Sequence, residues 1–266
     1  MLPARRALHL ERWHEAWVDA LANLNDFASH GYYGLDVEDL DACSQTQALQ
    51  DWHTAALGAL QLTQLAYSRG LPPAHLDTLF SYVLQCWNEY ASMVRSSSSN
   101  LLQPPIPLDA RQADYSAAVQ LLALPILLDR QELIPGITER LLGNECDRLL
   151  DYLSAAACDK TEAAERFFAL QPYAQLTPFF EQAEITVPPL QNYLQTAYAS
   201  ASATIFGDPY AATTPHQFRW AWEVAALVVL YGLDDSAFAL HPHYPADLVA
   251  YARQRLARNT PQAVRA

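Results

Sequence analysis

The stretch TPHQFRWAWEVAALVVLYGLDDSAFALHPHYPADLVAYAR, residues 214–253, decides the fold of this chain. It opens with a Thr-x-x-Gln capping box, runs through a strongly apolar helix, and ends in the turn His243-Tyr244-Pro245. One acid, Glu223, lies inside the apolar run, and the acid pair Asp234 and Asp235 follows it. Buried carboxylates need partners, and a helix C-terminus repels negative charge. The stretch therefore predicts a buried helix whose acids are held by internal groups, a metal or another protein.

Helical patterns dominate the rest of the chain, and strand alternation is nearly absent. Segment 72–94 repeats apolar residues at three-four spacing, and segment 51–68 before it stops at Gly70. The short connection predicts that these two helices are antiparallel neighbours. We therefore expect an all-α fold, a compact multi-helix bundle of antiparallel helices. The expected helices cover residues 51–68, 72–94, 111–128, 135–153, 159–170, 188–206, 215–231 and 245–258.

A polar, proline-containing segment at residues 95–109 divides the chain and is typical of a long surface loop. It predicts an N-terminal helical region, residues 1–100, and a C-terminal helical region, residues 101–266. The second region carries a pattern of the form WE…LDDS…YPxDL. We expect the two regions to form one compact unit.

The charge balance excludes some partners and favours others. Lys+Arg total 16 against Asp+Glu 29, which gives a formal net charge of -13. Nucleic-acid binding depends on Lys and Arg at the phosphates, so a nucleic-acid partner is not expected. A basic protein partner would be attracted, although acidity also simply keeps a protein soluble.

The location of the protein is expected to be cytoplasmic, without a membrane partner. Acids at Glu11, Asp19 and Asp26 interrupt any apolar leader, and the longest apolar run, 224–233, is too short to cross a bilayer. The four cysteines lack metal-ligand spacing and suggest buried free thiols in a reducing compartment.

Glu223 has two interpretations. A lone glutamate among apolar residues has a raised pKa and could act as a general acid. The favoured interpretation is structural, with Glu223 held by a tryptophan N–H or by Arg219, four residues earlier on the same helix face.

The acid pair and the nearby histidines also allow alternatives. In the structural interpretation Asp235 caps the turn 236–240, and Asp234 pairs with an arginine such as Arg219 or Arg253. In the chemical interpretation His243 joins Glu223 and the two aspartates in a metal-dependent enzyme, with His241 as a further possible ligand. No nucleophile or phosphate-binding motif appears, so we predict no catalytic residue, no cofactor and no metal.

A second acidic cluster lies near the N-terminus. Its composition is that of a protein-binding surface for a basic partner, and it equally suits an acidic helix N-terminus capped by Asp36. Both interpretations stay open. The cluster comprises Tyr32, Tyr33, Asp36, Glu38, Asp39 and Asp41.

Several segments together resemble the PoNi-like immunity proteins, bacterial antidotes to PoNe-type DNase toxins of type VI secretion. The likeness spans roughly residues 51–251, and its most specific part is the C-terminal pattern. The segments that carry it are 67–72 with Leu76, Phe80 and 87–90; Tyr115 with 121–128; and 222–227 with 233–236 and 244–248.

The resemblance implies an all-helical, non-enzymatic protein that binds a cognate toxin, expected to be a basic nuclease. It implies that Glu223, Asp234, Asp235, Tyr244, Pro245 and Asp247 are a structural signature or a shared docking pocket. We expect Asp234, Asp235 and the acidic N-terminal cluster to contact the toxin and block its substrate-binding cleft. The alternatives are the metal-dependent enzyme and a plain helical scaffold.

Overall fold

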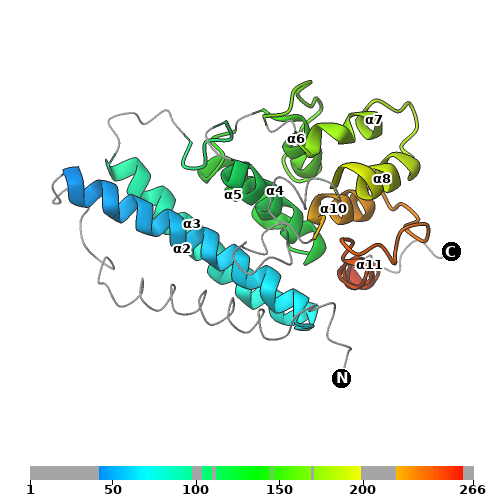
Figure 1. Ribbon diagram of the computed structural model, residues 1–266, viewed down its shortest axis with the longest axis horizontal. Helices are drawn as coiled ribbons and strands as arrows, with labels where there is room; N and C mark the ends of the chain where they lie inside the picture. Colours follow the sequence, from blue (N-terminus) through cyan, green and yellow to red (C-terminus); the bar gives the residue numbers. More distant parts are fainter. Residues whose placement is uncertain are drawn as a thin grey trace. The chain divides into compact units, whose positions relative to one another are not determined.

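The computed structural model describes residues 42–97, 104–109, 112–144, 146–168, 171–198 and 220–259. Within these ranges the elements are helices joined by turns and loops, and no strand occurs, so the all-α class is confirmed (Figure 1). None of the described helices combines the length and apolar character needed to span a bilayer. The helices are α2 (Ala42–Ser68), α3 (Pro73–Ser97), α4 (Gln112–Leu127), η2 (Gln131–Leu133), α5 (Ile134–Arg140), α6 (Arg148–Ser154), η3 (Tyr173–Leu176), α7 (Thr177–Phe180), α8 (Pro188–Asn192), η4 (Tyr193–Tyr198), α10 (Trp222–Leu230) and α11 (Ala246–Asn259).

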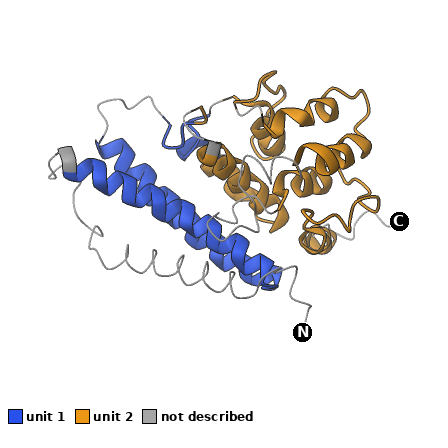
Figure 2. Ribbon diagram, in the orientation of Figure 1, with its two compact units in different colours: residues 1–107, 138–145, 208–217 blue, residues 108–137, 146–207, 218–266 orange. Residues whose placement is uncertain are grey.

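The chain forms two compact units (Figure 2). Among the described residues, the first unit holds α2 and α3 together with 104–107 and 138–144, and the second holds the remainder. The division of the sequence at residue 100 and the expectation of a single compact whole stay predictions.

The first unit is built on the α2–α3 hairpin. Trp52, early in α2, packs with Met93, late in α3, so the two helices run antiparallel as predicted. Gly70 ends α2 with a φ of 91°, a left-handed conformation that favours glycine. The N–H groups of Gly70 and Leu71 return to the carbonyls of Tyr67 and Ala66, which completes the helix C-cap.

The second unit is organised around α10 and α4. Every residue of α10 from Trp222 to Val229 is buried, and α10 packs against α4, α11 and α6. A helix with apolar residues on all sides and a single acid, Glu223, is expected inside a domain, so the apolar run of the sequence predicted its place correctly. Helix α4 is also buried over most of its length. These two helices form the centre of the unit.

The expected helix at 135–153 is broken in the structure into α5 and α6. Gly143 and Asn144 both adopt left-handed conformations, with φ of 59° and 56°. Asp147 then caps α6, because its Oδ1 accepts a hydrogen bond from the Leu150 N–H at 3.1 Å. A Gly-Asn turn followed by an Asp cap therefore ends one helix and starts the next.

The expected helix at 159–170 is wrong, because its described part, 159–168, is irregular. Two buried aspartates, at the start of α6 and within it, accept hydrogen bonds from backbone N–H groups of this segment, which a helix would use for its own hydrogen bonds. Asp151 accepts from the Ala164 N–H at 2.9 Å, and Asp147 accepts from the Phe168 N–H at 2.7 Å. Lys160 adds an ion pair with Asp151 at 2.6 Å. Tertiary contacts thus override the local helix propensity of this alanine-rich segment.

The expected α-helix at 188–206 is α-helical only at its start. It passes from α8 into the π-helical turn η4, and 199–206 lie outside the described residues. The i→i+5 turn brings Tyr193 and Tyr198 together, with ring centroids 5.8 Å apart. Both rings are buried.

We predict that Asp147→Asn weakens the tie between α6 and the irregular segment. The asparagine can still cap Leu150, but its amide group opposes the Phe168 N–H, where two donors then face each other. A buried donor without an acceptor costs about 1–3 kcal/mol, so the free energy of unfolding should fall by about 2 kcal/mol in denaturant titrations. Amide exchange should rise at 164–168. Unchanged exchange there would show that the carboxylate does not hold the segment.

Candidate functional site

The C-terminal signature begins where α10 ends. Gly232, with a φ of 60°, and Leu233 return their N–H groups to the carbonyls of Val229 and Val228, at 3.3 and 3.0 Å. This C-cap turns the chain sharply out of the buried helix. The acid pair therefore lies in this turn, immediately after the helix.

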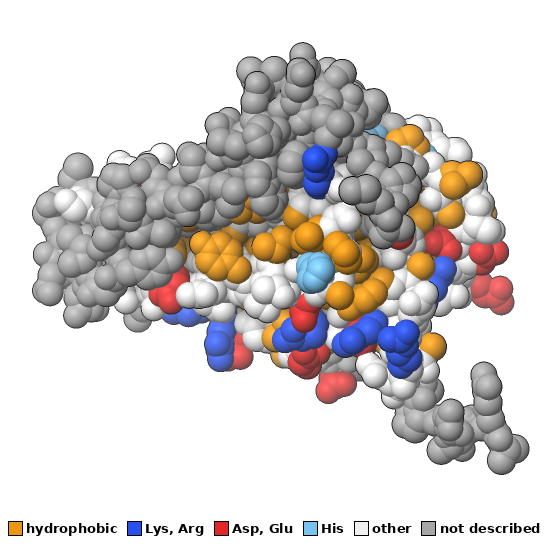
Figure 3. Space-filling view, turned by 90° about the horizontal axis from the view of Figure 1, so that it is seen from below, with side chains coloured by type: hydrophobic (Ala, Val, Ile, Leu, Met, Phe, Trp, Pro, Cys, Tyr) orange, Lys and Arg blue, Asp and Glu red, His pale blue; other side chains and the backbone are white. Residues whose placement is uncertain are grey.

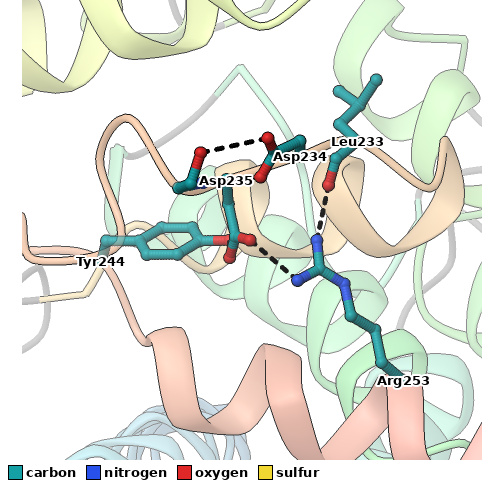
Figure 4. A network of polar contacts seen from close by, with 6 residues as sticks. Leu233, Asp234, Asp235, Tyr244 and Arg253 are labelled. Carbon is teal, nitrogen blue, oxygen red and sulfur yellow. Dashed lines mark hydrogen bonds and ion pairs between the residues drawn. The ribbon is translucent and has the colours of Figure 1, made fainter.

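Asp235 holds this turn to α11. Its carboxylate accepts a hydrogen bond from the Tyr244 hydroxyl at 2.7 Å and pairs with Arg253 at 2.7 Å (Figure 4). The same guanidinium donates to the Leu233 carbonyl. Asp235 is only 8% exposed, and a buried charge needs partners in place of water. Arg253 is its ionic partner and Tyr244 its neutral one.

Asp234 faces solvent and stabilises the turn locally. Its two oxygens accept from the Ser236 N–H and hydroxyl, both at 3.0 Å. These bonds to Ser236 lower the pKa of Asp234, so it stays charged at neutral pH. The expected roles are therefore reversed: Asp235 pairs with Arg253, and Asp234 caps the turn.

The remaining signature residues fix the start of α11. The Tyr244 ring packs edge-on against Phe238, with centroids 4.9 Å apart. The Pro245 carbonyl accepts from the N–H groups of Leu248 and Val249, which begins the helix. Asp247 lies in the first helical turn, where a negative charge is favourable. The His243 carbonyl accepts from the Ala221 N–H at 2.8 Å, which ties the same turn to the start of α10.

Glu223 has a tyrosine as its partner. Its Oε1 accepts a hydrogen bond from the Tyr193 hydroxyl at 2.9 Å, and the residue is 2% exposed. Arg219, the partner expected from helix spacing, lies outside the described residues. Burial raises the pKa of Glu223 to about 7, and the Tyr193 hydrogen bond offsets only part of this effect.

Buried phenols surround this carboxylate. Burial, and then the charge of Glu223, raises the pKa of Tyr173, Tyr193 and Tyr198, so all three hydroxyls remain protonated donors. The Tyr173 hydroxyl donates to Ser116 Oγ at 3.3 Å. The surroundings of Glu223 are thus those of an acid inside a packed core.

The sequence analysis missed a second buried acid site, on α6. The Tyr115 hydroxyl donates to Asp147 at 2.9 Å, and Asp147 is fully buried. Burial raises the pKa of Asp147, although three hydrogen bonds from backbone N–H groups and that of Tyr115 work against the shift. The Asn-x-x-Asp spacing 144–147, a turn residue followed by a helix cap, was the available signal.

The four residues of the metal-enzyme alternative do not meet. Glu223 is held by Tyr193 and Asp235 by Arg253, whereas Asp234 faces solvent. Over the part of the chain that the structure describes, no three His, Cys, Asp or Glu side chains converge in the way that a metal ion requires. His243 instead packs its ring 5.4 Å from Tyr198. Cys86, Cys146 and Cys158 are free thiols, and Cys146 is exposed, contrary to the expectation of burial.

The acidic cluster that contains Tyr32, Tyr33, Asp36, Glu38, Asp39 and Asp41 lies outside the described residues. Its expected contact with a partner stays a prediction. Of the acid pair, only Asp234 is exposed to solvent.

Comparison with known proteins places the chain in a family. Residues 145–248, which span the site above, match the family model for PoNe immunity proteins (PoNi), C-terminal. Residues 2–104 match the model described as PA2201 N-terminal domain-like. The crystal structure of protein PA2201 from Pseudomonas aeruginosa is similar, with a TM-score of 0.81 and 35% sequence identity over 95% of this chain and 91% of that chain. No curated protein matches the chain.

The helical fold and the matched C-terminal region together define an immunity protein, a class whose members bind a cognate toxin. The chain belongs to the PoNi family of immunity proteins, as the resemblance of its sequence indicated. The match over 2–104 also extends the likeness N-terminal to residue 51, where the sequence resemblance stopped.

We predict that the Glu223 carboxylate makes stability depend on pH. Below pH 4.5 it is protonated in both states, and between 4.5 and about 7 only the folded state keeps the proton. Stability therefore falls as pH rises through this window, by roughly 3 kcal/mol in total. The stability of Glu223→Gln relative to wild type should rise by about that amount between about pH 4 and pH 8 in denaturant titrations. A difference that is constant with pH would contradict a raised pKa.

We predict that the two adjacent acids differ in their contribution to stability. Asp235→Ala leaves the buried Tyr244 hydroxyl without its acceptor and removes the partner of Arg253, which is 41% exposed. The free energy of unfolding should fall by about 2 kcal/mol. Asp234→Ala, the matched comparison, should lose clearly less stability, because it removes only solvent-exposed hydrogen bonds to Ser236. Equal losses for both variants would contradict the assignment of their roles.

Proposed function

We propose that this immunity protein neutralises an antibacterial DNase toxin of the PoNe type, delivered by type VI secretion, by covering its basic DNA-binding cleft. The match of residues 145–248 to the PoNe immunity proteins carries this proposal. The protein would act in the cytoplasm, where the DNA of a bacterial cell lies.

The net charge of -13 supports a basic partner. A nuclease that grips DNA needs a cationic surface, and an acidic protein is drawn to such a surface and competes with phosphate for it. The acidic side chains do not cover the surface uniformly. On the face drawn in Figure 3, Lys and Arg side chains lie beside Asp and Glu side chains. Binding therefore depends on particular acidic regions rather than on a uniform coat.

The proposed mechanism is blockade without chemistry. Exposed acids steer the toxin, and buried contacts at the interface set the lifetime of the complex. Asp234 and the cluster of Tyr32, Tyr33, Asp36, Glu38, Asp39 and Asp41 are proposed to take part in the steering. Asp235 and Glu223 are proposed to stabilise the fold rather than to contact the toxin, because neighbouring side chains hold both carboxylates.

The function is tested with the toxin encoded beside the gene of this chain. Purified toxin should degrade plasmid DNA, and an equimolar amount of this protein should suppress the cleavage. Cells that produce the toxin should survive only when this chain is also produced. A toxin that stays fully active in an excess of the protein would overturn the proposal.

The acidic N-terminal cluster gives a kinetic prediction. Changing Asp36, Glu38, Asp39 and Asp41 to Asn or Gln should slow association with the toxin by about tenfold and flatten its salt dependence, because steering is screened by salt. Stopped-flow measurements from about 0.05 M to about 0.5 M salt would show this. Glu132 and Glu139, two exposed acids on η2 and α5, supply control variants of matched chemistry. An unchanged association rate would remove the cluster from the interface.

A further inference from the structure

A group of aromatic side chains lies on the second unit. Tyr152 of α6 packs against Phe180 at the end of α7, with ring centroids 4.2 Å apart, and Phe167 lies 6.0 Å from the same ring. Phe179 links Phe180 to Tyr231, at 5.3 and 5.9 Å. Phe179 and Phe180 are buried, whereas the other three are only partly buried. We name these five residues the aromatic patch.

The outer part of the aromatic patch is fixed in position. Phe167 belongs to the irregular segment 159–168, which Asp147 and Asp151 hold through the backbone N–H groups of Phe168 and Ala164. Both aspartates are buried, and neither bond depends on the exposed side chains of the segment. A surface that is already ordered loses little conformational entropy when it binds.

Charged side chains lie next to the aromatic patch, either in space or along the chain. The Arg148 guanidinium lies 5.8 Å from the Phe180 ring centre and 3.6 Å from Glu181. Glu162 and Glu165, on the segment that carries Phe167, are exposed and form no ion pair with another described residue. The charged residues near the aromatic patch are thus one paired glutamate, two exposed glutamates without an ion pair to a described residue, and Arg166, whose guanidinium lies 4.6 Å from the Phe168 ring centre.

This arrangement has the anatomy of a protein interface. Aromatic residues and arginine are enriched at the centres of such interfaces, and charged residues lie at their rims. The charge selects the occupant. A second copy of this chain would bring another net charge of -13 against the same glutamates, whereas a cationic protein would be attracted to them.

We propose that the aromatic patch, with Glu162 and Glu165 at its rim, is a docking surface for the cognate toxin. It receives an apolar area of the toxin that basic side chains flank. Tyr152 and Phe167 supply the apolar contact, and the two glutamates meet the flanking cations. This inference rests on the proposed function, and it assigns the contact surface that the family match leaves open.

The test uses a catalytically inactive form of the toxin encoded beside the gene of this chain, with binding followed by surface plasmon resonance. Phe167→Ala should weaken binding by about 30-fold or more, mainly through faster dissociation, as expected for an aromatic anchor. The double variant Glu162→Gln/Glu165→Gln should slow association by about three- to tenfold. The double variant Glu89→Gln/Glu139→Gln is the matched control for the glutamate pair, because both acids are exposed and lie outside the aromatic patch.

Phe167 contacts the buried Phe180, so Phe167→Ala could lose binding because it is less stable. A second measurement tests the docking surface without this variant. Hydrogen exchange of the wild-type complex should show new protection at 160–168 and at 178–184. The side chains of Glu162 and Glu165 lie in solvent, so the glutamate variants are expected to fold normally.

The outcomes separate the two proposals. If the wild-type protein does not bind the toxin, the proposed function fails. If the wild-type protein binds but exchange at 160–168 is unchanged and the glutamate variants associate normally, the docking surface is wrong while the function stands. A change of oligomeric state in the Phe167→Ala protein without any change in toxin binding would assign the patch to self-association and also overturn the proposal.

Discussion

The Asp235 carboxylate, shared by Tyr244 and Arg253, is the contact on which the C-terminal half depends. It connects the turn that follows α10, a helix buried on every side, to α11, a helix with one solvated face. Apart from Glu223, which accepts a hydrogen bond from Tyr193, α10 is apolar, so its own sequence supplies a single polar side chain to set its orientation in the core. The polar contacts at its two ends, the His243 carbonyl at the start and Asp235 after the end, contribute to that orientation. Within this chain Glu223, Asp235 and Tyr244 of the signature make internal contacts, whereas Asp234 faces solvent.

The negative charges of this protein serve two purposes. Asp147, Asp151, Glu223 and Asp235 are buried and hold the chain through hydrogen bonds or ion pairs. Lys160 and Arg253 pair with two of them, Asp151 and Asp235, and Glu223 is partly protonated near neutral pH. The exposed acids create the field that a basic partner senses. Net charge therefore indicates the chemistry of a partner, and only burial tells which acids can meet it.

Sequence periodicity predicted α3, α4 and α11 closely, because their apolar spacing reflects burial along a continuous face. It also predicted α2 and α10, but α2 begins at Ala42, before the expected residue 51, and α10 begins at Trp222, after the expected residue 215. It failed at 159–168, where the decisive groups are carboxylates that lie earlier in the sequence, on α6. Adjacent acids posed a similar difficulty: spacing shows that Asp234 and Asp235 follow the helix, but only the path of the turn decides which one points inward. The partner of Glu223 lies thirty residues away along the chain, beyond the reach of any helical spacing rule.

Lys160 is the one lysine in the sequence, and its ammonium group pairs with the buried Asp151. Apart from the amino terminus, the protein therefore presents a single primary amine to acylating reagents. Modification of that amine would cancel its charge and release the carboxylate beneath it. Coupling a resin or a dye to this amine would therefore break the ion pair between Lys160 and Asp151. Coupling through a thiol such as the exposed Cys146 leaves that ion pair intact.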